Sequence, residues 1–362
     1  MLEEVLPAIR AGLHRLTLAS IRVPRDLALE LFAHLDQPAP RLYRLALSLK
    51  LPADEAPVDL PHDLFRDSCP RLHSLLLKNI VLPPSPIPIL AGVDIAVYQH
   101  TFPRVVTFPV AFFLKAAPLR IVELMAGDFI LPEDLWSATV QDALRQLESI
   151  SLTYSDDQSN IVSVLPLQDI PEVILAPPKI PAGRLVMAHL DGPLRLDITS
   201  NERGTADTIV AYAPADTSST KQRRSFLDVQ ADFFDKRPDI NPAPFYFDTA
   251  YTDRITSLTV SSSRWRIVTK HAPRLPRCTS LTLELDDAKY LRLRPRKTPP
   301  AFPLLGILTL RLANAEISCA GWRNLALHVG ELPDSCRLVF ETVSLDFFDD
   351  DWLDTFHEVD VR

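Results

Sequence analysis

The chain has 362 residues, 47% of them hydrophobic, and a formal net charge of −8. This negative balance disfavours the basic footprint that nucleic acids require. The four cysteines form no C-x-x-C pair and no charged-then-apolar leader opens the sequence, so we expect a soluble, reduced protein of the cytoplasm or nucleus. The longest nearly uncharged apolar stretch, 80–93, contains four prolines, which exclude a membrane-spanning helix there.

An apolar pattern that begins at residue 71 returns elsewhere in the chain. Six of its positions, Leu72, Leu75, Leu77, Ile80, Leu82 and Pro83, align without a gap on Ile121, Leu124, Ala126, Phe129, Leu131 and Pro132. They align equally on Leu13, Leu16, Leu18, Ile21, Val23 and Pro24. A pattern that recurs every ~20–50 residues is typical of a solenoid. We therefore predict that residues 1–362 form a single α/β solenoid domain.

The first half of the chain is predicted to alternate short strands with short helices. Strands are expected where alternating apolar residues begin, at 13, 42, 72, 90, 121 and 147, each with one face buried. Helices are expected at 24–35, at 61–67 and at 109–118. The clearest helix is expected at 131–146, because Glu133 and Asp134 lie in its first turn.

The second half is predicted to be irregular over 156–250. There the apolar pattern indicates strands at 173–175, 185–187 and 194–198, a polar loop at 205–222 and a helix at 224–236. Strand units return at 255, 278 and 305. Residues 318–362 are predicted to form a C-terminal cap, with a helix at 318–332, a strand at 337–345, an acidic run at 346–354 and a helical segment at 351–359.

The strand pattern L-x-x-L-x-L, as in Leu72, Leu75 and Leu77, resembles that of the leucine-rich repeat family. The asparagine of the family pattern is not matched, because Asn79 and Asp128 fall one place early. More narrowly, units of the form P-R-L-x-x-L-x-L-x-x-x-x-L-P resemble the repeat regions of basidiomycete fungal F-box proteins. The resemblance implies a right-handed horseshoe, with short parallel strands on the concave face and irregular helices or loops outside. It also implies repeats that hold a substrate protein while an F-box docks the adaptor of a cullin-type ubiquitin ligase.

An F-box itself is not recognisable in the sequence. Residues 23–35 resemble the opening of one, yet they occupy the slot of a repeat helix, and no V-C-x-x-W-R follows. Residues 318–326 resemble the end of an F-box without an opening half. We therefore interpret 23–35 as a repeat helix, and we expect a ligase adaptor as partner only if an F-box lies upstream.

No arrangement of residues predicts catalysis, a metal site or a cofactor. His62 and Cys69 lack further zinc ligands, and the acidic pairs at 156–157, 286–287 and 349–351 lack the glycine turn of a calcium loop. Basic runs at 221–224 and 292–297 are interpreted as surface loops. Phosphate-binding and nucleophile motifs are missing from the sequence. The weakest alternative is an enzyme that uses His189, Asp191 and Asp197 of the irregular segment.

The leucine periodicity predicts which residues face a partner. Because the side chains of a strand alternate, residues between the inward leucines should lie on the exposed concave face. The predicted partner-binding residues are Arg15, Thr17, Arg44, Ser74, Lys78, Glu123, Ser149, Ser151, Ser257, Thr259, Ser280 and Thr282. Of these, Arg15, Arg44 and Lys78 are predicted to form a basic stripe. We predict a non-enzymatic module that binds a protein there; a stand-alone scaffold unrelated to ubiquitin transfer is the alternative.

Overall fold

The computed structural model divides into two compact units, Met1–Lys179 (unit 1) and Ile180–Arg362 (unit 2). It describes residues 2–52, 55–101, 105–154, 158–200, 206–213, 222–230, 244–272, 274–285, 301–312, 329, 332–341 and 358–361. Over these ranges the protein is a mixed α/β chain with a large, mostly parallel sheet of fifteen strands. The α/β class predicted from the sequence is therefore confirmed. The boundary between the units falls inside the segment 156–250, where the apolar pattern loses its spacing.

Unit 1 alternates strands with short helices, as the sequence predicts. Its strands are β1 (Leu18–Pro24), β2 (Arg44–Lys50), β3 (Val58–Asp59), β4 (Ser74–Lys78), β5 (Ile80–Val81), β6 (Ile95–Gln99), β7 (Val105–Thr107), β8 (Ile121–Ala126), β9 (Asp128–Ile130), β10 (Ser149–Tyr154) and β11 (Glu172–Ala176). Its helices are α1 (Leu2–Gly12), η1 (Leu13–Arg15), η2 (Arg25–Leu27), α2 (Ala28–His34), η3 (Leu64–Asp67), η4 (Pro88–Gly92), α3 (Val110–Ala116), η5 (Glu133–Trp136), α4 (Ala138–Leu144) and α5 (Ser159–Val162), where η marks a 3₁₀ helix.

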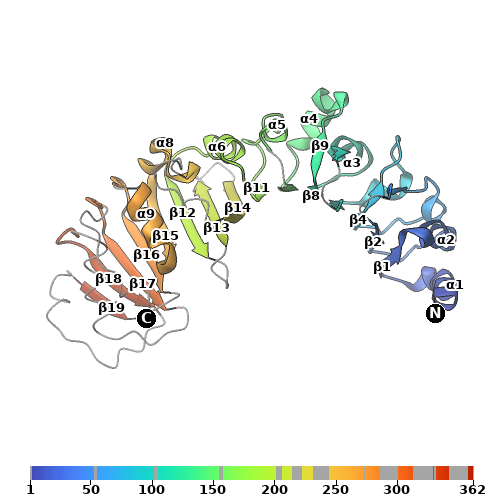
Figure 1. The fold of residues 1–362 in the computed structure, drawn as a ribbon, viewed down its shortest axis with the longest axis horizontal. Helices are drawn as coiled ribbons and strands as arrows, with labels where there is room; N and C mark the ends of the chain where they lie inside the picture. Colours follow the sequence, from blue (N-terminus) through green and yellow to red (C-terminus); the bar gives the residue numbers. More distant parts are fainter. Residues whose placement is uncertain are drawn as a thin grey trace. The chain divides into compact units, whose positions relative to one another are not determined.

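The main sheet of unit 1 runs in chain order, β1-β2-β4-β6-β8-β10-β11, with parallel neighbours (Figure 1). One buried row of side chains crosses it in register: Leu47, Leu77, Tyr98, Leu124, Leu152 and Leu175. Burying a side chain of this size contributes roughly 1.5–3 kcal/mol. This row, repeated two residues earlier in each strand, forms the core of the sheet on one face.

A hydrogen-bonded turn leads into most of these strands. The N–H of Leu42 donates to the carbonyl of Ala39 at 3.1 Å, and the same three-residue contact joins Leu72 to Cys69. It recurs in unit 2, where the N–H of Cys278 donates to Leu275 at 3.2 Å. Because both ends of the turn are buried apolar residues, the first leucine of the pattern closes the turn and the next two lie on the strand.

Three predicted strand units are out of register with the structure. Ala19 pairs with Leu45, so the first strand lies three residues later than predicted, and Leu18 is exposed. The cause is local: α1 and η1 occupy residues 2–15, so Leu13 and Leu16 close the turn instead of lying on the strand. The gapless alignment of 13–24 on the later units is therefore wrong by three residues.

The other two errors lie at the fourth and fifth units. Tyr98 and Leu124 occupy the position of Leu77, where the sequence pattern predicts Ile95 and Ala126. The residues from 87 to 97 are almost uniformly apolar, so alternation alone does not fix which of them point inward. The turn in which Val93 donates to Leu90 fixes that phase.

Two predicted helices take a different form. Residues 131–146 are split into η5 and α4 because Ser137 adopts an extended conformation and its hydroxyl caps α4 by accepting from the N–H of Val140. Residues 61–67 contain only η3, in which Phe65 and Arg66 have positive φ. The helices predicted at 24–35 and 109–118 are confirmed as η2 with α2 and as α3.

Unit 2 begins with a helix and an antiparallel meander. Its elements are α6 (Ile180–Ala188), β12 (Leu194–Ser200), β13 (Ala206–Ala213), β14 (Gln222–Gln230), η6 (Phe245–Phe247), α8 (Thr249–Thr252), β15 (Ile255–Ser261), η7 (Ser262–Arg264), α9 (Trp265–His271), β16 (Ser280–Leu285), β17 (Ile307–Leu312), β18 (Arg337–Glu341) and β19 (Glu358–Val361). The order of its strands is β14-β13-β12-β15-β16-β17-β18-β19, and Figure 1 shows β15 to β18 side by side. In the series β12-β15-β16-β17-β18-β19 all neighbouring strands are parallel.

The irregular segment differs most from its prediction. The strand expected at 185–187 is helix α6, the loop expected at 205–222 contains β13, and the helix expected at 224–236 is strand β14 up to residue 230. β14 buries Arg224, Ser225 and Phe226 in succession, which removes the alternation that marks a strand. The strand units at 255, 278 and 305 are confirmed, with Leu258, Leu281 and Leu308 in register.

Several predicted features lie outside the described residues. These are nearly all of the helix at 318–332, the acidic run 346–354, most of the helical segment 351–359, the basic run 292–297 and the acidic pair 286–287. Strand β18 covers the first part of the strand predicted at 337–345, and residues 358–361 form strand β19.

Candidate partner-binding surface

The exposed face of the unit 1 sheet carries an unexpected set of apolar side chains. Five half-buried residues, here called the apolar patch, lie on the neighbouring strands β4, β6 and β8: Leu76, Ile95, Val97, Ile121 and Met125. Leu76 pairs with Val97, and Ile95 pairs with Ile121. They alternate with the buried core residues of the same strands, so they point to the opposite face. Polar side chains are the usual choice on a face that only meets water.

Charged residues lie beside this patch and within it. Lys78 follows Leu76 by two positions on β4, whereas Glu123 lies between Ile121 and Met125 on β8 and pairs directly with Val97. Arg44 lies on β2 and pairs with Ser74, at the edge of the patch. Contiguous apolar side chains among polar and charged ones mark many protein-binding surfaces.

Ten of the twelve predicted partner-binding residues lie on strands, at positions that alternate with the core. They are Arg44, Ser74, Lys78, Glu123, Ser149 and Ser151 in unit 1, and Ser257, Thr259, Ser280 and Thr282 in unit 2. Thr259 is buried, so the predicted exposure is wrong at that residue. The prediction is wrong for Arg15 and Thr17, which precede β1. Arg15 lies in η1, and its guanidinium donates to the His14 imidazole at 3.0 Å.

The basic stripe is not formed as predicted. Arg15 is outside the sheet, and Lys78 pairs with Ser48, four positions along β2 from Arg44. Two register-matched strands rise about 3.3 Å per residue, so Arg44 and Lys78 lie at opposite ends of their strands. The apolar patch lies on β4, the strand of Lys78, and on β6 and β8 beyond it.

A chain of polar side chains runs along the amino ends of the unit 1 strands. Its members, here called the polar chain, are Tyr43, His73, Asp94, Arg120 and Glu148. Tyr43 stacks on His73 with ring centroids 4.7 Å apart, and His73 Nδ1 lies 2.8 Å from Asp94 Oδ1. Arg120 lies 3.9 Å from Asp94 and makes hydrogen bonds of 2.6 and 2.7 Å to both carboxylate oxygens of Glu148.

The main chain explains why these five residues line up. The carbonyl of each accepts the first N–H of the next strand unit; His73, for example, accepts from Asp94 at 3.1 Å and Ile95 at 3.2 Å. Each member therefore holds the same place in its repeat, immediately before a strand. The sequence hides this because the spacing between members varies. Hydrogen bonds to Glu148 come first among the causes that raise the pKa of Arg120.

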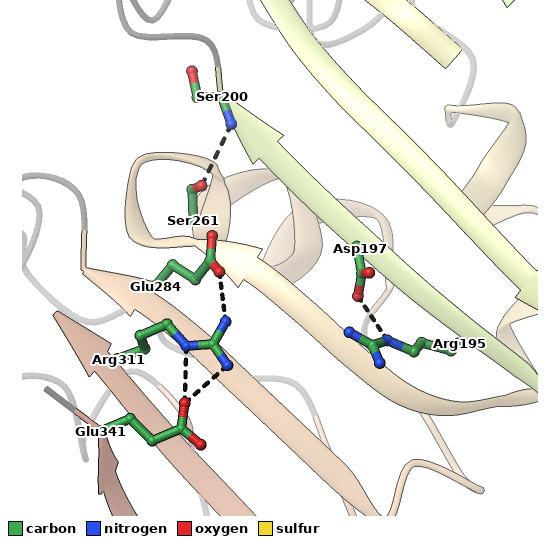
Figure 2. A network of polar contacts seen from close by, with 7 residues as sticks. All are labelled: Arg195, Asp197, Ser200, Ser261, Glu284, Arg311 and Glu341. Carbon is green, nitrogen blue, oxygen red and sulfur yellow. Dashed lines mark hydrogen bonds and ion pairs between the residues drawn. The ribbon is translucent and has the colours of Figure 1, made fainter. Parts of the chain in front are cut away.

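The corresponding face of unit 2 is mainly polar, with Ile307 and Val339 among its apolar members. Thr259, Thr282 and Thr309 occupy one row across β15, β16 and β17. Two positions further, Arg311 bridges Glu284 at 2.9 Å and Glu341 at 2.8 Å, as Figure 2 shows. Arg195 and Asp197 pair on β12 at 3.1 Å. The acidic and basic groups named here are therefore paired with one another.

The weak enzyme alternative gains no geometric support. Asp197 is held by Arg195, and the burial of His189, together with nearby Arg224, lowers the pKa of His189 while Asp191 raises it. The three cysteines in the described ranges are buried, and burial raises the pKa of Cys69 and Cys336 to about 11 and that of Cys278 to about 12. A protonated, buried thiol is a poor nucleophile.

A buried cluster of polar side chains connects several elements of unit 2. Arg264, on η7, pairs with the buried carboxylate of Asp207 and donates to Ser200 Oγ at 3.1 Å. Tyr246 is buried beside them, and burial first, then Asp207, raise its pKa. The cluster links the β12–β13 hairpin to η6 and η7, which lie later in the chain.

Within the described ranges, no group of three or more His, Cys, Asp or Glu side chains is placed to hold a metal ion. No helix in the same ranges has the length and apolar character that crossing a membrane requires. Comparisons with protein-family models, with curated proteins and with solved structures found no match.

Proposed function

We propose that this chain is a non-enzymatic protein-recognition module with a leucine-rich-repeat-like fold, in which the exposed sheet face of unit 1 binds a partner protein. The apolar patch carries the proposal. Leu76, Val97 and their three neighbours keep apolar surface on a face where solvation alone favours polar residues. Lys78 beside the patch and Glu123 within it supply charges of both signs, which orient a partner more than they add affinity.

The fold part of the proposal is supported by the register of the strands. Consecutive parallel strands place Leu45 beside Leu75 and Leu47 beside Leu77, and matching turns precede them. Asn79 adds a side-chain link of the kind that repeat proteins use: its amide donates to the Leu49 carbonyl at 2.9 Å and accepts from the Thr101 N–H at 2.8 Å. Its position one place early therefore does not prevent a contact between repeats.

The proposed link to ubiquitin ligases concerns residues 23–35. Their helix α2 buries Ala28, Leu31 and Phe32, with Leu35 buried just beyond it. Apolar side chains that are already packed inside unit 1 are not available to an adaptor. This supports a role for the segment as a repeat helix, so that any adaptor contact would come from another part of the protein.

The test compares two double variants in cells by quantitative cross-linking and mass spectrometry. Leu76→Asp with Val97→Asp places two carboxylates in the patch. The matched control, Leu29→Asp with Leu304→Asp, adds the same charge at exposed apolar positions outside the patch. Proteins that cross-link to the wild type and to the control, but at least ten-fold less to the patch variant, are the expected partners.

Equal recovery of every partner by both variants would rule out the patch as the binding surface. Circular dichroism of the two purified variants checks that each remains folded. A ligase adaptor among the recovered proteins supports the substrate-receptor form of the proposal. Consistent recovery of other proteins without an adaptor favours the stand-alone scaffold.

A further inference from the structure

Unit 1 contains a second row of short parallel strands beside its main sheet. β3 pairs with β5, Val58 opposite Ile80, and β7 pairs with β9, Val105 opposite Asp128. These four strands follow β2, β4, β6 and β8 in the chain, so each belongs to one of four successive units. The row therefore follows the order of the main sheet.

The row is interrupted at its centre. β4 and β6 are paired, but β5 and β7, which follow them, belong to separate two-stranded sheets within the described ranges. The Val81 carbonyl accepts from Leu60 on the β3 side, and the Phe108 N–H donates to Ile130 on the β9 side. Because successive peptide groups alternate, the Leu82 carbonyl and the main-chain groups of Thr107 face the interrupted side, while the Leu82 N–H is already bonded to the Tyr98 hydroxyl. Such edges are templates for another strand.

A cavity of about 500 Å³ occupies this interruption. Val81 and Leu82 line one side, Val105 and Thr107 the other, and Phe112 contributes to the wall. This volume lies in the usual range of ligand sites, about 300–1,000 Å³. It corresponds to a few residues of extended chain rather than to a whole domain.

The charge of the cavity restricts its occupant. Among its described lining residues, Lys115 and Asp134 are the charged ones, and they pair with each other. Six prolines, at 57, 83, 84, 86, 109 and 132, present apolar surface without an N–H. Tyr98, also in the wall, has its hydroxyl hydrogen-bonded to the main chain of Leu82. A neutral, apolar segment matches this lining, because a charged one would lose its hydration without gaining a partner.

We propose that the space between β5 and β7 is a docking site for an extended, uncharged peptide segment of a partner protein. The segment adds as a strand between the two short sheets. Main-chain hydrogen bonds to the two edges supply affinity, and the proline and phenylalanine walls select apolar side chains. The site is separate from the apolar patch and does not depend on the function proposed for it.

The experiment uses the full chain and linear heptapeptides selected on it from a displayed random library. Each selected peptide is synthesised with blocked ends, together with a twin that carries N-methyl groups on alternate residues. We expect apolar, uncharged sequences, and a loss of affinity of at least about ten-fold in the twin, because each lost main-chain hydrogen bond costs roughly a factor of ten. Fluorescence polarisation measures both.

A matched pair of variants locates the site. Phe112→Lys places a cation in the cavity and should weaken binding at least ten-fold, whereas Phe112→Leu keeps the wall apolar and should bind within about three-fold of wild type. The patch variant Leu76→Asp with Val97→Asp should bind like wild type. Equal binding of the methylated twin, equal binding by Phe112→Lys, loss of binding in the patch variant, or no selected peptide that binds below about 1 mM would each overturn the proposal.

Discussion

In both units, the carbonyl just before a strand accepts hydrogen bonds from the start of the next strand unit, but the side chains at this position differ between the units. In unit 1 the His73 carbonyl accepts from Asp94 and Ile95; in unit 2 the Thr279 carbonyl accepts from Gly306 and Ile307, at 2.9 and 3.1 Å. The unit 1 residues are long and polar, and they contact one another along the polar chain. In unit 2 the Thr279 hydroxyl turns back to the Thr256 carbonyl at 3.2 Å. The main-chain hydrogen bonds fix the residue immediately before each strand, and they do not restrict which side chain it carries.

The units also differ in the buried polar interactions that connect their elements. Unit 1 relies on a neutral side chain, Asn79, which bridges two neighbouring strand units. Unit 2 relies on the buried ion pair of Arg264 and Asp207. A buried charge that loses its partner is far more costly than a buried amide that loses one hydrogen bond. The comparison predicts that unit 2 is the more sensitive of the two to a single polar substitution.

The largest effect is expected for Asp207→Ala. Removing the carboxylate takes the Asp207 charge away from the buried Arg264 guanidinium, so the free energy of unfolding should fall by about 3–5 kcal/mol. Urea denaturation followed by circular dichroism measures this. The control is Tyr246→Phe in the same cluster: the described residues offer the Tyr246 hydroxyl no hydrogen-bond partner, so its loss should be neutral or slightly stabilising. A loss below about 1 kcal/mol for Asp207→Ala would contradict the comparison.

The next effect is expected for Asn79→Ala in unit 1. The substitution leaves the Leu49 carbonyl and the Thr101 N–H without their side-chain partner, and Ala tolerates the φ of 58° poorly. We expect a loss of about 2–4 kcal/mol, since each orphaned buried group costs about 1–3 kcal/mol. Asn79→Gly keeps the backbone conformation accessible, so the difference between the two variants isolates the backbone contribution. Equal stability of Asn79→Ala and wild type would show that the Asn79 hydrogen bonds do not stabilise unit 1.

The strands that the sequence predicts correctly are those with clear alternation. In Leu42, Leu45 and Leu47 the residues between the leucines are polar or small, so the phase is unambiguous. At 87–97 nearly every residue is apolar, and only the turn that ends at Val93 determines which ones are buried. The error concealed the apolar patch, because Ile95 was assigned to the core.

Long-range contacts account for most of the remaining differences. The polar chain has no signature in one repeat, since Asp94 and Arg120 become neighbours only through the register of β6 and β8. In β14 a buried Arg224 replaces the expected apolar residue, which makes the spacing of Phe226 and Val229 look helical. Neither a partner that arrives from a distant strand nor a buried charge can be read from local periodicity.

The third effect concerns the ionisation of buried cysteine thiols, of which the described part of unit 2 has more than that of unit 1. Unit 1 contributes the buried Cys69, and unit 2 contributes Cys278 and Cys336, all with pKa values raised by burial to about 11 or 12. Unfolded thiols ionise near pH 8.5. As pH rises above this value the unfolded state loses protons first, so the stability present below it is lost progressively up to the folded pKa.

Unfolding measured from pH 7.5 to 10.5 should therefore show decreasing stability. Cys278→Ser and Cys69→Ser should each flatten this slope, because burial keeps both folded thiols largely protonated over this range while the unfolded thiols ionise. The slope is read within each variant, so the cost of a buried serine hydroxyl does not enter. A slope unchanged by either substitution would mean that these thiols ionise alike in the folded and unfolded states.

The smallest effects are expected for the exposed ion pairs, beginning with Arg311→Met in unit 2. The substitution keeps the apolar stem but removes the cation that bridges Glu284 and Glu341. The Arg311 side chain is 45% exposed, so solvent screening limits the pair to roughly 0.2–1 kcal/mol. The stability gap to wild type should shrink in about 1 M salt, where screening acts within about 3 Å. Arg120→Met, in the more exposed polar chain of unit 1, should lose less than Arg311→Met. A larger loss at Arg120 would show that the polar chain stabilises unit 1 cooperatively. In that case the stability of unit 1 would depend on its exposed polar side chains as well as on the buried Asn79.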